Sequence, residues 1–143
     1  MREIFVSKSV QPMLNPEKSQ MPEKALYPVV ASLNRFVEGG RMNVSVPSCG
    51  GDRGDLKGLK DYDQKLYSMR FSDAAPQYRL LGVFPAKDVF VGVDLVDRNV
   101  IDGAWNDRCL RVLKQLNAWG SKRPEFLTYV DLDLVLSKWA YAK

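Results

Sequence analysis

Hydrophobic and polar residues alternate along the central part of the chain, between residues 66 and 98. Three runs in this part, residues 66–71, 78–84 and 89–95, carry apolar side chains at every second position. Because successive side chains of a strand point to opposite faces of a sheet, each run is typical of a β-strand. The segments between the runs have the length and the turn-forming residues of hairpin connections. The pattern therefore predicts an antiparallel meander of three strands, with an apolar face and a basic face.

Apolar residues on either side of this region recur with helical spacing instead. Residues 26–37 carry them at intervals of three and four, which predicts a helix that starts near Tyr27 and ends at glycines 39–40. A second helix is expected between Asp102, as its N-cap, and Gly120, because one face of that segment is apolar and the opposite face is basic.

Five shorter segments complete the expected elements. In chain order these are an opening strand (2–7), a loop or short turn with three prolines (11–24), a long loop with an extended part at 42–46 (41–54), a short helix capped by Asp55 (56–63), and a helix opened by Pro124, for which a strand over 130–135 is the alternative. No repeat or low-complexity segment interrupts them, so residues 1–143 are interpreted as one domain.

Composition narrows the class of protein. Of the 143 residues, 45% are apolar and 27% are charged, as in ordinary globular proteins, and no run approaches the roughly 20 apolar residues of a membrane span. No apolar signal segment follows Met1. Cys49 and Cys109 have neither disulfide-framework nor metal-ligand spacing, so free thiols and a cytoplasmic location are expected.

The charged residues limit the chemistry that is open to the chain. It contains no histidine, which excludes Ser–His and Cys–His nucleophiles and histidine-bound metals, and acid–base work would fall to Lys, Tyr, Asp or Glu. The formal net charge is +4. Residues 98–123 hold six basic residues against two acids, which favours an acidic partner, either nucleic acid or protein.

The meander also carries a family resemblance. The segment Leu66-Tyr67-Ser68-Met69-Arg70-Phe71, then Tyr78-Arg79-Leu80-Leu81, then a valine-rich strand ending in Asp97-Arg98, resembles the RelE/ParE toxin superfamily of bacterial toxin–antitoxin systems. The resemblance covers residues 1–9 and about 25–105. Ser68 stands where the family usually has glutamate, and Asp97 where it usually has a basic residue. The resemblance implies an α+β fold, with an N-terminal helical layer on a small, mostly antiparallel sheet and residues 110–143 as an extra C-terminal helical region.

The resemblance also implies a function and a set of site residues. The protein would be a toxin that cleaves mRNA on the ribosome without a metal or cofactor and is neutralised by a cognate antitoxin. Arg79, Arg98 and Lys57 would be catalytic, because guanidinium groups stabilise a pentacovalent phosphate and a lysine could bind phosphate or accept the 2′-hydroxyl proton. The residues expected to bind substrate are Lys60, Arg70 and Trp105. Arg79 and Arg98 should then share one concave, positively charged surface.

Structural interpretations of the same residues stay open. Each arginine could pair with Asp94 or Asp97, the two lysines could simply be solvated, and Trp105 could belong to a helix core. Trp105 also lies near the place where active relatives have a tyrosine or histidine. A gyrase-inhibiting toxin and a binding module without activity are therefore the alternatives, and the C-terminal extension could cover the sheet or mediate self-association.

Overall fold

The predicted meander forms the centre of the sheet. The computed structural model describes residues 1–51, 54–71, 73–99, 103–118 and 125–142. Strands β4 (Tyr67–Arg70), β5 (Tyr78–Ala86) and β6 (Val89–Asp97) pair antiparallel in sequence order, which confirms the meander. Its register places Arg70 opposite Arg79.

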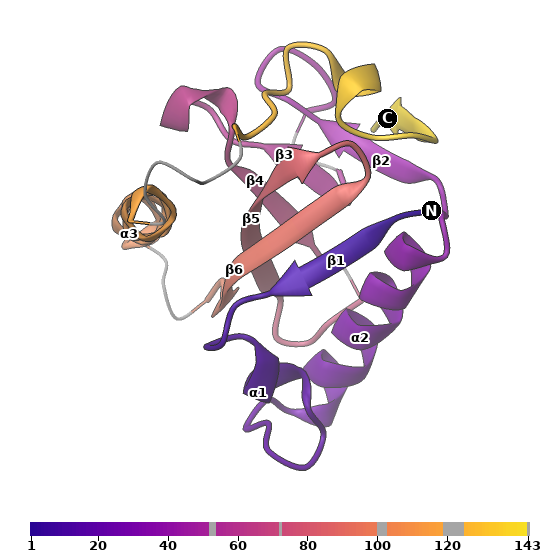
Figure 1. Ribbon diagram of the computed structural model, residues 1–143. Helices are drawn as coiled ribbons and strands as arrows, with labels where there is room; N and C mark the ends of the chain where they lie inside the picture. Colours follow the sequence, from indigo (N-terminus) through magenta and orange to yellow (C-terminus); the bar gives the residue numbers. More distant parts are fainter. Residues whose placement is uncertain (52–53, 72, 100–102, 119–124, 143) are drawn as a thin grey trace.

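Four further strands extend this centre to a seven-stranded mixed sheet in the order β1-β6-β5-β4-β3-β2-β7 (Figure 1). The added strands are β1 (Glu3–Val6), β2 (Met42–Ser45), β3 (Leu56–Gly58) and β7 (Trp139–Tyr141). Strand β3 is antiparallel to β4, whereas β1 runs parallel to β6 and β2 runs parallel to both β3 and β7. The two ends of the chain thus form the two edges of the sheet.

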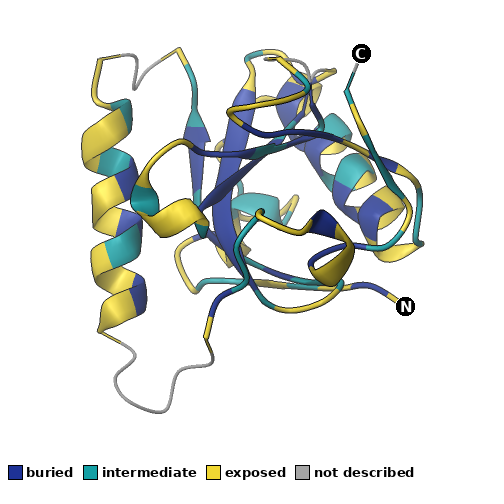
Figure 2. Cartoon of the chain, turned by 90° about the horizontal axis from the view of Figure 1, so that it is seen from above, coloured by how far each residue is buried: buried dark blue, intermediate teal, exposed yellow. Residues whose placement is uncertain are grey.

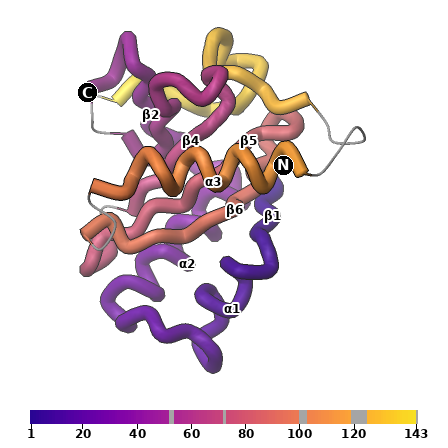
Figure 3. Tube along the Cα trace, turned by 90° about the vertical axis from the view of Figure 1, so that its left-hand side faces the viewer, coloured from indigo at the N-terminus to yellow at the C-terminus, as the bar shows by residue number. Residues whose placement is uncertain are grey.

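One long helix covers each face of the sheet. Helix α2 (Glu23–Val37), preceded by the short α1 (Gln11–Leu14), packs on one side and α3 (Trp105–Asn117) on the other. The buried residues of α3 face the sheet in Figure 2, and Figure 3 shows this helix lying across the meander. Among the described residues, no helix has the length and apolar character that crossing a membrane requires.

This architecture corrects the expected fold. An N-terminal helical layer on a small antiparallel sheet is wrong, because the sheet is mixed, has seven strands, and carries helices on both faces. The helix expected over residues 56–63 is also wrong, because β3 occupies its start. The side chain of Asp55 does not cap a helix but accepts a hydrogen bond from Asn43 N–H (3.2 Å), beside β2. The extended part expected within the loop at 41–54 is β2.

The described residues of the C-terminal extension form no α-helix beyond α3. Neither a helix nor a strand over 130–135 forms; the described part holds a single 3₁₀ turn, Leu132–Leu134, and the edge strand β7. Leu132, Val135 and Leu136 are nevertheless buried in the core on the α2 side of the sheet. Their helix-like spacing therefore reflects the burial of these three side chains from an irregular segment of the chain. The extension packs on its own sheet, which is one of the two outcomes that its apolar content allowed. Asp102, Gly120 and Pro124 lie outside the described residues.

Helix α2 begins four residues earlier than predicted because Pro28 is accommodated within it. A proline has no N–H to donate to the carbonyl four residues before it. In this helix that carbonyl belongs to Lys24, and it accepts a hydrogen bond from Ala75 N–H instead (3.1 Å). The helix ends at Val37, two residues before the predicted stop at Gly39, whose φ of +85° favours glycine.

Candidate functional site

A pocket of about 310 Å³ opens on the α3 face of the sheet. Two cross-strand pairs contribute to its lining: Lys57 of β3 lies opposite Ser68 of β4, and Arg70 of β4 lies opposite Arg79 of β5. Side chains at every second position of a strand share a face, so Ser68 and Arg70 project to the same side of the sheet. Arg79, which lies opposite Arg70 on the neighbouring strand, projects to that side too. The alternation that builds the meander therefore also concentrates positive charge.

Arg98 and Trp105 complete the pocket from beyond the sheet, together with Leu59. Arg98 directly follows β6, and its N–H donates to the carbonyl of Gln77 (2.9 Å). Trp105 is the first residue of α3, and the Arg98 guanidinium carbon lies 5.0 Å from the centre of its ring, within the range of a cation–π contact. Five predicted site residues therefore converge on one pocket, and Arg79 and Arg98 share a concave surface as expected.

The electrostatics of the pocket favour an anion. Arg79 is only 9% exposed. Burial, followed by repulsion from Arg70 and Arg98, lowers the pKa of Arg79 to about 10. A buried cation crowded by other cations is costly to the fold, and a bound anion offsets that cost.

Asp94 and Asp97, the two acids of β6, have hydrogen-bond partners other than Arg79. Asp94 accepts a hydrogen bond from Nη2 of Arg108 on α3 (3.1 Å), and Asp97 accepts one from Asn99 N–H (2.9 Å). Arg79 itself donates to the carbonyl of Tyr78 (3.1 Å) and to the side-chain oxygen of Gln77 (3.2 Å), both neutral acceptors. The alternative in which Asp94 or Asp97 is the hydrogen-bond partner of Arg79 is therefore not realised.

Ser68 is a site residue that the sequence reasoning did not select. Its side chain is 2% exposed, it lines the pocket, and its Oγ has no hydrogen-bond partner among the described residues. A buried hydroxyl without a partner costs about 1–3 kcal/mol, so a ligand atom at this position would be favoured. Its placement on the same strand face as Arg70 was the available signal.

Lys60 is the one predicted site residue that does not line this pocket. It lies past the end of β3 and lines two neighbouring depressions of the surface. Lys57, which pairs within the sheet, lines both the basic pocket and one of these depressions, whereas Lys60 lines only the depressions.

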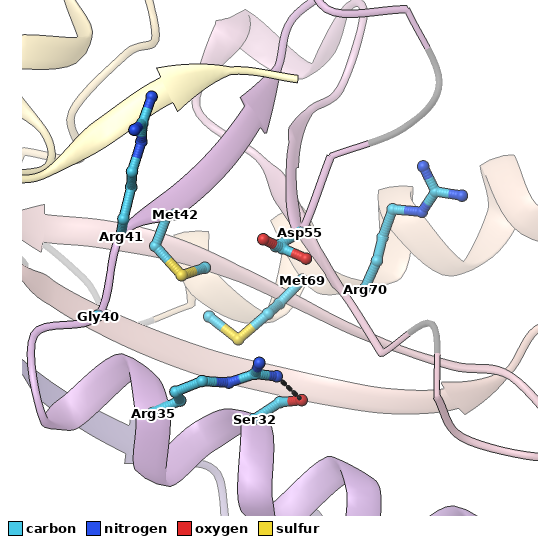
Figure 4. A pocket seen from close by; sticks show the side chains of 8 residues that line it. All are labelled: Ser32, Arg35, Gly40, Arg41, Met42, Asp55, Met69 and Arg70. Atoms are coloured by element: carbon cyan, nitrogen blue, oxygen red, sulfur yellow. Dashed lines mark hydrogen bonds between the residues drawn. The ribbon is translucent and has the colours of Figure 1, made fainter. Parts of the chain in front are cut away.

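A second small pocket lies between α2 and the sheet. It has a volume of about 50 Å³ and its lining includes Met42, Met69, Asp55 and Arg35. Figure 4 shows Arg35 hydrogen-bonded to Ser32 (3.3 Å) and extending toward the two methionines. This pocket is too small for a nucleotide, so the basic pocket on the α3 face is the candidate site.

Comparison with known proteins adds no family to this description. No family model, no curated protein and no solved structure matches the chain. Among the described residues, no group of three or more His, Cys, Asp or Glu side chains is placed to hold a metal ion.

Proposed function

We propose that the protein is a toxin that binds single-stranded RNA in the basic pocket and cleaves mRNA on the ribosome. The observation that carries the proposal is the convergence of Lys57, Arg70, Arg79 and Arg98 on one concavity. Planar guanidinium groups donate paired hydrogen bonds to phosphate oxygens, and several of them stabilise charge that develops on a phosphate. The cytoplasm, where mRNA is translated, is the location that this function requires.

The proposed reaction uses the RNA's own 2′-hydroxyl as nucleophile. The 2′-oxygen bonds to the neighbouring phosphorus while the bond to the 5′-oxygen breaks, which leaves a 2′,3′-cyclic phosphate and a 5′-hydroxyl. The Lys57 ammonium donates to a phosphate oxygen, the proton of the 2′-hydroxyl passes to water, and the leaving oxygen takes a proton from water. Arg79 and Arg98 stabilise the pentacovalent phosphate, and the Ser68 hydroxyl donates to one of its oxygens.

A binding module without cleavage is the second candidate, and a specific observation favours it. The chain has no histidine, and the nearby Tyr62 donates its hydroxyl proton to the side chain of Asn106. Burial, as the largest cause, raises the pKa of Tyr62 to about 12, far above the value that suits a general base at neutral pH. The same pocket would then bind RNA, or another nucleic-acid strand, without cleaving it.

Two measurements on the purified protein separate these candidates. Fluorescence anisotropy with a 2′-O-methyl RNA strand, which lacks the nucleophile, measures binding alone. Incubation of translating ribosomes with the protein, followed by analysis of the 3′ ends of the mRNA, measures cleavage. Binding with cleavage to cyclic phosphate ends supports the toxin nuclease; binding without cleavage supports the second candidate.

Variants at Arg79 test the role of the pocket. Arg79→Gln should weaken RNA binding by about tenfold to a hundredfold, the effect of losing a charged hydrogen bond to phosphate, and reduce its salt dependence. Arg111→Gln is the matched control, because Arg111 is exposed on α3 and does not line the pocket. Equal loss in both variants, or no RNA binding by the unaltered protein, would contradict the proposal.

A cognate antitoxin is part of the proposed function. A toxin of this kind must be held inactive in the cell that makes it, so a neighbouring small reading frame should encode a protein that binds it. Co-expression of that frame should restore growth, and the protein that it encodes should co-purify with the toxin. Expression of the unaltered protein alone should arrest growth, whereas expression of the Arg79→Gln variant alone should not.

A further inference from the structure

We infer that a second depression beside the basic pocket binds the base of the nucleotide next to the phosphate. This inference rests on the proposed function, since it assumes that RNA is the ligand. The depression has a volume of about 430 Å³ and shares Lys57, Leu59 and Trp105 with the basic pocket. The two hollows are therefore adjoining parts of one groove on the α3 face.

The lining of the groove changes character between the two hollows. The basic pocket presents four cationic side chains, as a phosphate requires. The second depression presents mostly apolar and aromatic groups with two lysines, as a flat base beside a charged backbone requires. Its lining residues are Val46, Pro47, Gly51, Lys57, Gly58, Leu59, Lys60, Tyr62 and Trp105. A phosphate site followed by an aromatic site matches the order of a phosphate and its neighbouring base along a strand of RNA.

The wall of the second depression is held in a strained backbone conformation. Residues 61–64, none of them glycine, have φ values between +51° and +72°. A left-handed turn of L-residues costs about 1–2 kcal/mol per residue, and such strain tends to be retained at functional sites. The strained turn places Tyr62 at the depression, and the hydrogen bond from Tyr62 to Asn106 ties this wall to α3.

Hydrogen bonds from the C-terminal segment hold the turn in place. Tyr129 N–H donates to the carbonyl of Gln64 (3.2 Å), and the Tyr129 hydroxyl donates to the carbonyl of Leu59 (3.1 Å). Its ring lies against Gly58, where a Cβ atom would come within 2.5 Å of it. Tyr129 belongs to the C-terminal extension, so this extension holds the turn in place although it contributes no lining residue to the depression.

Charge marks where the groove ends. A third depression next to the second is lined by Asp61 and Asp63 together with Lys60. Two carboxylates repel a phosphate backbone, so the third depression is unsuited to a further nucleotide. The structure thus assigns one phosphate site and one adjoining base site to the groove.

The test compares two dinucleotides that differ only in one base. Both carry a single phosphodiester with a 2′-O-methyl group, and one lacks the base on one side of the phosphate; each side is examined in turn. They compete with a fluorescent 2′-O-methyl RNA strand for the protein. For one of the two sides, the intact dinucleotide should bind about tenfold more tightly than the abasic one, the usual effect of stacking a base on aromatic side chains.

A variant identifies the depression as the cause. Tyr62→Leu should abolish that difference and leave the affinity for the abasic dinucleotide unchanged, whereas Tyr27→Leu, at an exposed tyrosine on α2, should preserve it. Equal binding of intact and abasic dinucleotides by the unaltered protein overturns this inference while the proposed function stands. Failure of both dinucleotides and of the RNA strand to bind removes the proposed function itself. The comparison of ligands on the unaltered protein decides the matter even if Tyr62→Leu does not fold.

Discussion

Replacing Arg79 by methionine should make the protein more stable while weakening its affinity for RNA. The fall in the pKa of Arg79 from 12.5 to about 10 corresponds to about 3 kcal/mol of destabilisation of its charged form in the folded state. The main cause is burial, and repulsion by Arg70 and Arg98 adds to it. Methionine has a similar length, carries no charge, and suits a position that is 9% exposed.

Two hydrogen bonds oppose this gain. Arg79 donates to Tyr78 and Gln77, and each bond contributes about 1 kcal/mol. The expected net effect of Arg79→Met is a stabilisation of about 1 kcal/mol, or about 2–4 °C in the melting temperature of a domain of this size. The sign for pH follows from the lowered pKa: the destabilisation is fully present below pH 10 and declines as the pH rises from 10 toward 12.5.

Urea unfolding at neutral pH and low salt measures the effect as a shift of the midpoint at constant slope. In 1 M salt, where the Debye length is about 3 Å, the advantage of the variant should shrink but not vanish, because salt screens the repulsion and leaves the cost of burial. Arg111→Met on the exposed face of α3 should stay within about 0.5 kcal/mol of the unaltered protein. An Arg79→Met protein less stable by 1 kcal/mol or more would refute the reasoning and make Arg79 a structural residue.

Three further outcomes are expected. Arg2 is 1% exposed, donates hydrogen bonds to carbonyls at the end of α2 and in the C-terminal segment, and lies near Asp88. Removing its side chain should lower the free energy of unfolding in urea by about 3–5 kcal/mol. A loss below about 1 kcal/mol would contradict this. Gly58→Ala should destabilise the protein by about 1–3 kcal/mol, because the new Cβ meets the Tyr129 ring, and Tyr129→Ala should relieve that extra cost in a double-mutant cycle. One thiol, exposed Cys49, should react quickly with a thiol reagent at pH 8, whereas Cys109, whose pKa burial raises to about 11, should react only on unfolding; two fast-reacting thiols would refute this.

Part of the candidate site could be predicted from sequence because strand alternation fixes which face a residue occupies. Arg70 and Arg79 lie on predicted strands, and the short connection between those strands makes them neighbours. Arg98 and Trp105 were selected from the family resemblance alone, and the tertiary structure brings both of them to the same pocket. Ser68 was not selected, because only burial and the absence of a described hydrogen-bond partner reveal that its hydroxyl is available.

The sequence by itself determined the opening strand β1, the central meander, the apolar stripes of α2 and α3, and the glycine that stops α2 just after Val37. Only the tertiary structure decided the rest of the sheet. Strands β2, β3 and β7 are three or four residues long, and β2 finds its partner β7 nearly a hundred residues away. Segments this short have no preference of their own for a strand; they become strands because neighbouring strands satisfy their backbone hydrogen bonds and bury their side chains. The C-terminal residues were bound to be buried by their apolar character, but the shape of the surface beneath them decided that they pack as an irregular segment and an edge strand instead of a helix.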